Sequence, residues 1–148
     1  MAAETSRATD EAEIRALIDA RAEAVRAKDV DGAMSSVATD LLAFDVVNPL
    51  RYSGADAARE RLEDWFGSFE GPLGYEMADL SIATGGDIAY CHSLNRVSGT
   101  KVGGGGLVMW WRATVCWRRV GGTWRVAHEH SSVPFDPQSA MAALDLEP

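Results

Sequence analysis

The sequence predicts an α+β fold in which a curved, mostly antiparallel sheet packs on helices that come first in the chain. Apolar residues recur at helical spacing up to about residue 69, whereas long strand-like runs separated by glycine turns occupy the chain from Gly71 onward. Helices followed by a series of antiparallel strands are typical of α+β domains, in which the helices gather on one face of the sheet. The 148 residues fit one such domain.

Three helical segments are expected before the strands. The first covers about residues 10–28 and begins at Asp10, with Glu13 at the spacing of a capping box. A shorter one lies near residues 30–37, and the third covers 54–69. Their apolar stripes are Ile14, Leu17, Ile18 and Val25; Val30, Ala33, Met34 and Val37; and Ala55, Ala58, Leu62, Trp65, Phe66 and Phe69. Residues 1–9 are expected to form a disordered tail.

The strands follow from apolar runs and turn residues. The first strand covers 41–47 and ends at Asn48-Pro49, because proline cannot donate to a strand ladder. The later strands are expected at 75–84, 87–99, 106–120 and 123–133, with hairpin turns at Gly85-Gly86-Asp87, at Gly103 to Gly106 and at Gly121-Gly122. The domain is expected to end near residue 136, and residues 137–148 to form a C-terminal tail.

The composition argues against several classes of function. A net charge of −8 and a pI near 4.8 oppose binding to nucleic acid, which depends on clustered lysine and arginine. No segment approaches the roughly 18 apolar residues of a membrane span, and no apolar run follows a basic start, so we expect a cytoplasmic protein without membrane contact. Cys91 and Cys116 lack CxxC spacing and are expected to be reduced, buried thiols.

The expected strand 106–120 indicates a partner. One face carries Leu107, Met109, Trp111, Ala113, Val115 and Trp117, and the other carries Val108, Trp110, Arg112, Thr114 and Cys116. Neither set is strongly polar, so both faces need a cover, and the helices supply one. A second copy of the chain is the simplest second cover, and we therefore expect a homodimer.

Two of the three histidines stand close together in the last strand, in WRVAHEHSS at residues 124–132. Strand alternation puts Trp124, Val126, His128, His130 and Ser132 on one face and Arg125, Ala127, Glu129 and Ser131 on the other. The first set suits the polar lining of an otherwise apolar pocket. If the other face looks inward, Glu129 and Arg125 take the place of the histidines.

Asp45 and Arg112 are candidate catalytic residues. Asp45 lies in the apolar run between Phe44 and Val46, where a buried carboxylate can act as a general base. Alternatively, it forms a structural ion pair with Arg112 or with a histidine. Arg112 could clamp a carboxylate, phenolate or enolate of a ligand, or form a cross-strand salt bridge with Glu129 or Asp45.

The histidines allow two interpretations. His128 and His130 could hold a metal ion if Asp45 or His92 converged on them. We favour a proton-transferring or hydrogen-bonding role for His130 and expect no metal. The residues expected to orient an apolar ligand are Tyr52, Trp65, Asn95, Trp110 and His128.

The order helix, helix, strand, helix, four strands, together with FDVVNPL, YSGADAARERLEDWF and WRVAHEHSSVPFD, resembles the SnoaL-like and ketosteroid-isomerase-like families of the nuclear transport factor 2-like superfamily. It is especially similar to an uncharacterised bacterial branch of ketosteroid isomerase homologues. The resemblance covers about residues 10–136 and implies a cone-shaped, cystatin-like fold around a deep pocket. It also implies that Asp45 corresponds to the aspartate base of the isomerase. The first helix offers no aromatic residue to match the tyrosine of that enzyme's oxyanion hole.

Two functions remain open, because this fold hosts both enzymes and binding modules. The first is an isomerase, cyclase or dehydratase that needs no cofactor and removes a proton next to a carbonyl group. Asp45 would be its base, with Arg112 and His130 stabilising or reprotonating the enolate. The second is a non-catalytic dimer that binds a small apolar or carbonyl-containing ligand, or another protein.

Overall fold

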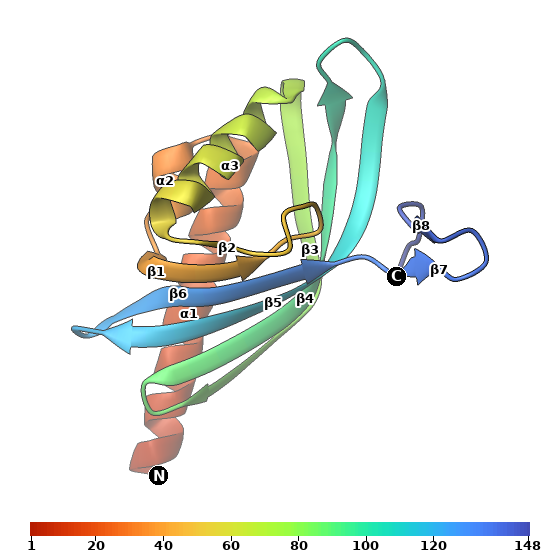
Figure 1. The fold of residues 1–148 in the computed structure, drawn as a ribbon. Coiled ribbons are helices and arrows are strands. Elements are labelled where there is room, and N and C mark those ends of the chain that lie inside the picture. The colour runs from red at the N-terminus through yellow and green to blue at the C-terminus, as the bar shows by residue number, and fades with distance from the viewer.

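The computed structural model describes residues 1–148 as three helices, a large curved sheet and a small C-terminal hairpin (Figure 1). The helices are α1 (Ala2–Arg26), α2 (Val30–Met34) and α3 (Ala55–Gly67). The sheet contains β1 (Val37–Phe44), β2 (Tyr52–Ser53), β3 (Phe69–Gly85), β4 (Ile88–Lys101), β5 (Gly106–Val120) and β6 (Thr123–Ser132), and the hairpin contains β7 (Phe135–Asp136) and β8 (Met141–Ala142). None of the helices combines the length and hydropathy that a membrane crossing needs.

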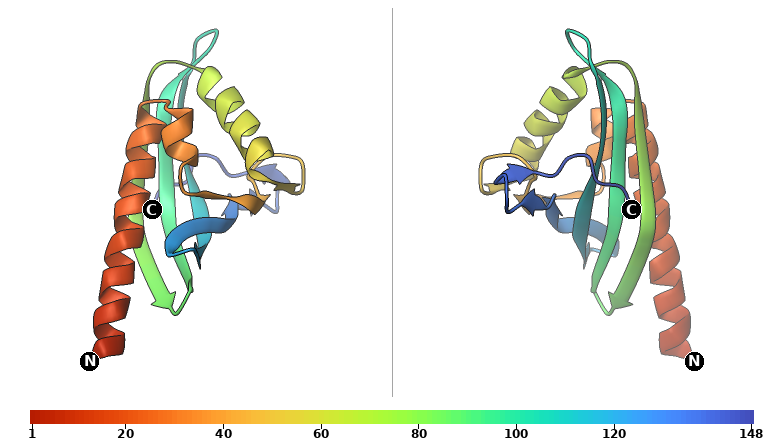
Figure 2. Two further views of the ribbon diagram at one scale, coloured as in Figure 1. Left: turned by 90° about the vertical axis from the view of Figure 1, so that its left-hand side faces the viewer. Right: turned by 90° about the vertical axis from the view of Figure 1, so that its right-hand side faces the viewer.

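The large sheet has the strand order β2-β1-β6-β5-β4-β3. All neighbouring strands are antiparallel except β1 and β6, which run parallel. This arrangement confirms the α+β fold class with a mostly antiparallel curved sheet. The helices lie on one face of the sheet, here called the inner face, and the C-terminal hairpin projects on the side of the opposite, outer face (Figure 2).

The inner face and the helices enclose two separate hydrophobic clusters. The first cluster consists of Ile14, Ile18, Val37, Leu41, Ala43, Ala58, Ala89, Cys91, Trp117, Trp124 and Val126. The second cluster consists of Ala24, Val25, Ala33, Phe66, Phe69, Leu73 and Val97. Helix α1 and strand β4 contribute to both, so the two clusters follow one another along these elements. The space between them is where polar side chains enter the interior.

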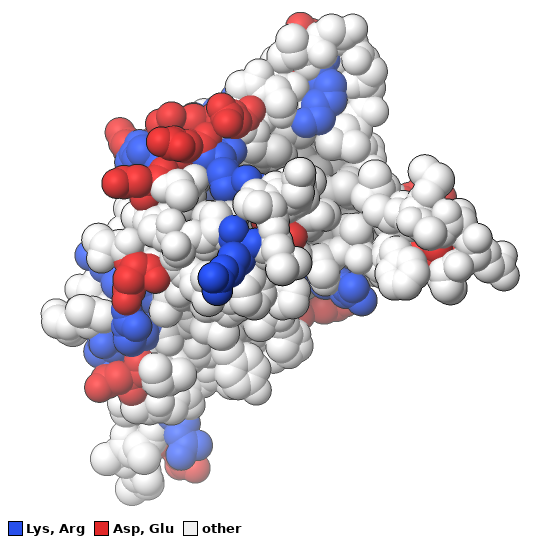
Figure 3. Space-filling view, viewed as in Figure 1, with Lys and Arg blue, Asp and Glu red and all other residues white.

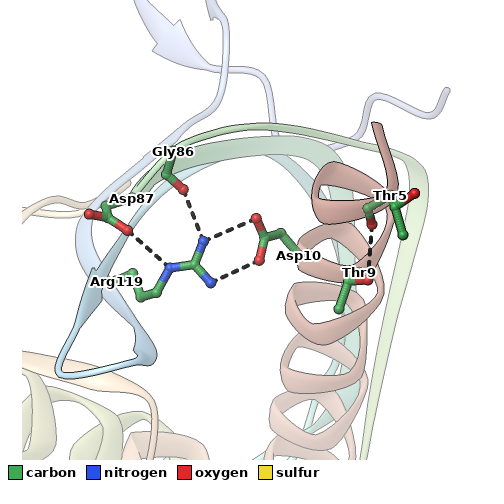
Figure 4. A network of polar contacts seen from close by, with 6 residues as sticks. All are labelled: Thr5, Thr9, Asp10, Gly86, Asp87 and Arg119. Atoms are coloured by element: carbon green, nitrogen blue, oxygen red, sulfur yellow. Dashed lines mark hydrogen bonds and ion pairs between the residues drawn. The ribbon is translucent and has the colours of Figure 1, made fainter. Parts of the chain in front are cut away.

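Helix α1 is longer than its sequence pattern predicts, because it begins at Ala2 and includes the residues expected to form a tail. Asp10 is therefore not its cap but lies within the helix. Its carboxylate accepts two hydrogen bonds from Arg119 of β5, at 2.9 and 3.0 Å (Figure 4). Arg119 also donates to the Asp87 carboxylate at 3.1 Å and to the carbonyl of Gly86 at 3.0 Å. This guanidinium ties the first half of α1 to the β3–β4 turn.

Strand β6 does not alternate as its sequence suggests. Trp117 of β5 pairs with Val126, but Cys116, only one residue earlier, pairs with His128. One extra residue, Ala127, therefore forms a β-bulge, and a bulge changes which face the following side chains occupy. Trp124 and Val126 point inward into the first cluster, whereas the histidines after the bulge point outward. The expectation that all four share one face is wrong for this reason.

The remaining elements differ from prediction mainly at their ends. The cysteines lie in strands as expected, Cys91 in β4 and Cys116 in β5, and both are free thiols. Strand β1 runs from Val37 to Phe44, so Asp45 follows the strand instead of lying within it. The chain after residue 134, most of it expected as a tail, forms the β7–β8 hairpin.

Candidate functional site

Five polar side chains lie between the two hydrophobic clusters on the inner side of the sheet. This set, here called the polar layer, consists of Arg21, Tyr75, Ser93, Asn95 and Glu129. Burying such groups costs free energy unless they are hydrogen-bonded or paired, so a layer of them inside a fold of this size requires an explanation. They come from α1, β3, β4 and β6.

The spacing of each element places these residues in one layer. On α1, Arg21 lies three residues after Ile18 of the first cluster and three before Ala24 of the second, so it shares their helix face. On β4, Ser93 and Asn95 occupy the two inward positions between Cys91 and Val97. Residues that face one way along an element thus change from apolar to polar and back again.

Tyr75 and Glu129 reach the same level from the two sides of the sheet. Tyr75 of β3 pairs with Val97 and therefore points inward. Glu129 of β6 pairs with Val115 of β5 and Ala43 of β1, which also face inward. The bulge at Ala127 produces this orientation, since regular alternation from Val126 would turn Glu129 outward.

Arg21 and Glu129 form an ion pair across the interior, between Nη1 and Oε1. Their side chains are 25% and 20% exposed, so neither is fully buried. Burial disfavours the charge of Arg21, but the facing carboxylate outweighs this effect, and the pKa of the guanidinium is raised. The pair thus holds a positive and a negative charge next to each other inside the fold.

Tyr75, Asn95 and Ser93 form a hydrogen-bonded chain beside this ion pair. Ser93 Oγ donates to Asn95 Oδ1 at 2.6 Å, and Asn95 Nδ2 donates to the Tyr75 hydroxyl at 3.1 Å. Burial raises the pKa of Tyr75 to about 12, with opposing effects from Arg21 and Glu129. The phenol is therefore uncharged at neutral pH and can donate a hydrogen bond.

Two atoms of the polar layer have no partner within the protein. Glu129 is bonded only through Oε1, which leaves Oε2 free to accept. The Tyr75 hydroxyl accepts from Asn95 but has no acceptor for its own proton. One acceptor of this kind on β6 and one donor on β3, both facing the interior, are what a ligand with complementary groups requires.

A second polar group lies next to the layer, between the end of β1 and α3. Arg61 Nη2 donates to Asp45 Oδ2 at 2.8 Å, and its guanidinium lies over the ring of Tyr52, 4.6 Å from the centroid. The Arg61 Nε atom is buried without a partner. Burial raises the pKa of Tyr52, and both Glu129 and Asp45 add to this effect. Tyr52 therefore lies within electrostatic range of the polar layer as well as of Asp45.

Asp45 occupies a different environment from the one its sequence suggests. Its side chain is 33% exposed, and Val46 N–H donates to Oδ1 at 2.7 Å while Arg61 occupies Oδ2. The expected ion pair exists, but its partner is Arg61 on α3. Sequence reasoning could not find this pairing, because Arg61 lies on the polar side of a helical pattern.

The other two residues predicted to be catalytic lie on the outer face. Arg112 pairs with Leu94 and Ser132 across the strands, and its Nε donates to Ser132 Oγ at 3.1 Å. His130 pairs with Thr114 and Phe44. The sheet therefore separates both from Glu129 and Tyr75, and the structure does not bring them together with Asp45.

The residues predicted to orient a ligand are similarly divided. Asn95 belongs to the polar layer, Tyr52 contacts Arg61, and Trp65 of α3 packs against Phe69 beside the second cluster. His128 and Trp110 lie on the outer face instead.

The outer face collects all three histidines. The His128 ring lies 2.6 Å from the Leu42 carbonyl oxygen through Nδ1, and Phe44 contacts both His128 and His130 edge-on. His92 stacks on Tyr90. A shallow depression of about 240 Å³ on this face is lined by Asp79, His92, Ser93, Leu94, Arg112, Ala113 and Thr114. No three histidine, cysteine or acidic side chains are placed to hold a metal ion together.

Sequence reasoning missed Arg21, Tyr75 and Ser93 and named Glu129 only as the alternative. A signal for Arg21 exists, because it interrupts the apolar face of the first helix between Ile18 and Val25. Tyr75 and Ser93 carry no comparable signal. Their inward direction depends on strand register, which the sequence does not give.

Comparison with known proteins agrees with this architecture. Residues 14–136 match the model of the SnoaL-like domain family. A nuclear transport factor 2-like protein of unknown function from Pseudomonas putida KT2440 has 38% sequence identity and a TM-score of 0.87, over 95% of this chain and 98% of that one. No curated protein matches the sequence.

More distant solved structures share the fold. A proposed dehydratase of the nuclear transport factor 2-like family from Streptomyces avermitilis has 16% identity and a TM-score of 0.74, over 85% of this chain and 97% of that one. A ketosteroid isomerase-like protein from Erwinia carotovora atroseptica has 20% identity and a TM-score of 0.69, over 82% and 93%. Because the family model spans most of the sequence, the chain belongs to the SnoaL-like family of the nuclear transport factor 2-like superfamily.

Proposed function

We propose that this protein binds a small, partly apolar carbonyl compound at the polar layer and removes a proton next to the carbonyl group. Such a reaction would make it an isomerase, cyclase or dehydratase that needs no cofactor. The observation that carries the proposal is the pair of unpartnered atoms, Glu129 Oε2 and the Tyr75 hydroxyl proton, between two hydrophobic clusters. The likeness to a proposed dehydratase and to a ketosteroid isomerase-like protein supports the reaction class.

In this proposal Glu129 is the base. Its free oxygen removes the proton from the carbon next to the carbonyl, and the electron pair moves onto the carbonyl oxygen to form an enolate. The Tyr75 hydroxyl donates a hydrogen bond to that oxygen, which is worth most when the negative charge develops. Glu129 then returns the proton to another carbon in an isomerisation, or in a dehydration the enolate breaks the bond to a β-hydroxyl group, which takes up that proton and leaves as water. Arg21 fixes the position of the carboxylate throughout.

Asp45 has a supporting role in the proposal. Both of its oxygens are already hydrogen-bonded, so it is less available to remove a proton than Glu129. Its contact with Arg61 would hold the guanidinium, whose buried Nε has no partner, beside Tyr52 and facing an incoming ligand. Arg112 and His130 take no part, because they lie behind the sheet.

Exchange of solvent deuterium into a panel of ketones tests the reaction. We expect the unsubstituted protein to catalyse this exchange. Glu129→Gln should abolish it, Asp45→Asn should reduce it, and Arg112→Ala should leave it unchanged. Thermal stabilisation of each variant by the same ketones separates binding from chemistry, since a ligand that binds the native state raises its stability. Exchange that survives Glu129→Gln would remove the glutamate from the mechanism.

The outer face favours a second candidate, a non-catalytic homodimer that binds a ligand or a protein. Tyr90 and Val108 are about half exposed there, and Trp110 and Leu94 lie between them on neighbouring strands. A sheet face that exposes large apolar side chains typically has a cover. Ketones that stabilise the protein without any deuterium exchange would favour this binding function over the enzyme, and a dimer measured by sedimentation equilibrium is expected in both cases.

A further inference from the structure

The C-terminal segment from Val133 to Pro148, here called the arm, is a folded unit that stands apart from the body. Phe135 pairs with Ala142 and Asp136 with Met141 in the small β7–β8 sheet. The Ala143 amide donates to the Pro134 carbonyl at 2.8 Å, and the Ala140 amide donates to the Asp136 carbonyl at 2.7 Å. No hydrogen bond of the arm reaches any other part of the chain.

The arm exposes apolar side chains that its own subunit does not cover. Phe135, Met141, Leu144 and Leu146 are 45–68% exposed. A hollow of about 510 Å³ is formed by arm residues alone: Pro134, Phe135, Asp136, Ser139, Met141, Ala142, Ala143, Asp145 and Leu146. An isolated two-stranded hairpin is only marginally stable in water, so this unit requires contact with another surface.

The position of the arm indicates which surface it meets. The right-hand view of Figure 2 shows the strands between the arm, which lies in front, and α1, which lies behind. The arm thus leaves the end of β6 on the side of the outer face, opposite the helices that cover the polar layer. In Figure 1 it projects beyond the sheet, so a body packed on the outer face would also lie against the arm.

Charge makes a second copy of this chain the best occupant. The arm contains Asp136, Asp145 and Glu147 and no lysine or arginine. On the outer face, the Arg112 guanidinium has the neutral Ser132 as its only hydrogen-bond partner and no carboxylate within ion-pair distance. Figure 3 shows the densest group of acidic residues of the body over α2 and α3, on the opposite side of this view from the arm. An acidic, apolar arm and a neighbouring apolar face with an unpaired arginine complement each other across a two-fold axis, where each contact occurs twice.

We propose that two copies exchange arms. Each arm packs its apolar side chains on the outer face of the second copy and brings its carboxylates toward the Arg112 of that copy. The inference rests on the proposed homodimer and goes beyond it, because it assigns residues 133–148 to the interface. It does not depend on the proposed chemistry at the polar layer.

Sedimentation equilibrium of the full chain and of substituted chains tests the exchange. We expect Met141→Asp and Arg112→Glu each to raise the dimer dissociation constant at least tenfold. Val102→Asp is the matched control, since Val102 is an exposed apolar residue in the β4–β5 turn, which Figure 1 shows at the tip of the sheet, remote from the arm. It should leave the dissociation constant unchanged. Both arm and control positions are exposed, so the variants should keep the circular dichroism spectrum of the parent.

A photo-crosslinking residue in place of Met141 supplies an independent readout in an otherwise unaltered chain. Crosslinked dimers, with peptides joined to β4, β5 or β6 of a second copy, are the expected product. A chain that is monomeric would overturn both the homodimer and the exchange. A dimer whose dissociation constant does not change in Met141→Asp, and which yields only crosslinks within one chain, would overturn the exchange. It would still support the homodimer.

Discussion

Arg21 and Glu129, which are 108 positions apart in the chain, meet as an ion pair between α1 and β6. Both side chains point into the interior at the level where the two hydrophobic clusters separate. An ion pair in such a place contributes less stability than its geometry suggests, because removing two charges from water offsets most of their attraction. Its presence between two apolar clusters therefore fits a functional role better than a purely structural one.

Breaking the pair from one side should destabilise the fold. Arg21→Met leaves the Glu129 carboxylate half-buried without a partner, and we expect it to lower the free energy of unfolding by about 1–3 kcal/mol. The double variant Arg21→Met, Glu129→Leu should recover most of this loss, since it removes both charges. Urea unfolding of the four proteins of this cycle measures the coupling. Losses that simply add would show that the two side chains do not interact.

Tyr75 predicts a loss of stability at alkaline pH. Burial raises its pKa from 10 to about 12 in the folded protein, so the folded state holds the phenolic proton more tightly than the unfolded state. The stabilising effect is complete below pH 10 and is lost as the pH rises through 12. We expect a decrease on the order of 2 kcal/mol, because each pKa unit corresponds to about 1.4 kcal/mol. Thermal unfolding between pH 9 and 12 measures it.

Phenylalanine variants separate the contribution of Tyr75 from other causes of lower stability at alkaline pH. Tyr75→Phe should reduce the alkaline decrease and leave the part that comes from Tyr52, whose pKa burial also raises, while Tyr90→Phe, at an exposed position on the outer face, should retain it in full. An unchanged pH profile in Tyr75→Phe would show that another group titrates in this range.

The contact between Asp10 and Arg119 should anchor α1. Asp10→Ala removes two charge-assisted hydrogen bonds from a carboxylate that is only 8% exposed, and it releases the first half of the helix from the β3–β4 turn. Glu11→Ala, one residue away, removes only an exposed pair with Arg15. We expect the first variant to lower the melting temperature clearly and the second to change it little, since exposed pairs within a helix contribute about 0.3–0.5 kcal/mol. Hydrogen exchange of the α1 amides should increase only in Asp10→Ala.

Periodicity was sufficient to predict most of the elements. The strand 106–120 coincides with β5, and the expected third helix overlaps α3 closely, because apolar stripes and glycine turns are local signals. The start of α1 was harder to predict from the sequence. Asp10 and Glu13 have the spacing of a capping box, but the carboxylate of Asp10 is used by Arg119, which is 109 positions away. Such a long-range pairing leaves no local signal.

The candidate site was harder to predict for the same reason. Asp45 is predicted as a site residue because a carboxylate in an apolar run is conspicuous, whereas its partner Arg61 carries no such signal. The inward direction of Glu129 depends on a single extra residue in β6, and the orientation of both histidines depends on it as well. A period of two, counted across a bulge, gives the wrong face for every residue beyond it.

The bulge at Ala127 leads to a final prediction. Deleting a residue from a regular strand turns all following side chains to the opposite face, but Ala127 is the extra residue between the pairs Trp117–Val126 and Cys116–His128. Its deletion should give a regular β6 in which Val126 and Glu129 still point inward and His128 outward. We expect this variant to keep the fold and the Arg21–Glu129 pair, with a loss of stability of roughly 1–2 kcal/mol. Deleting Ala113, a buried alanine in the regular part of β5, should unfold the protein. Circular dichroism and thermal unfolding compare the two, and equal damage from both deletions would mean that Ala127 is not the bulged residue.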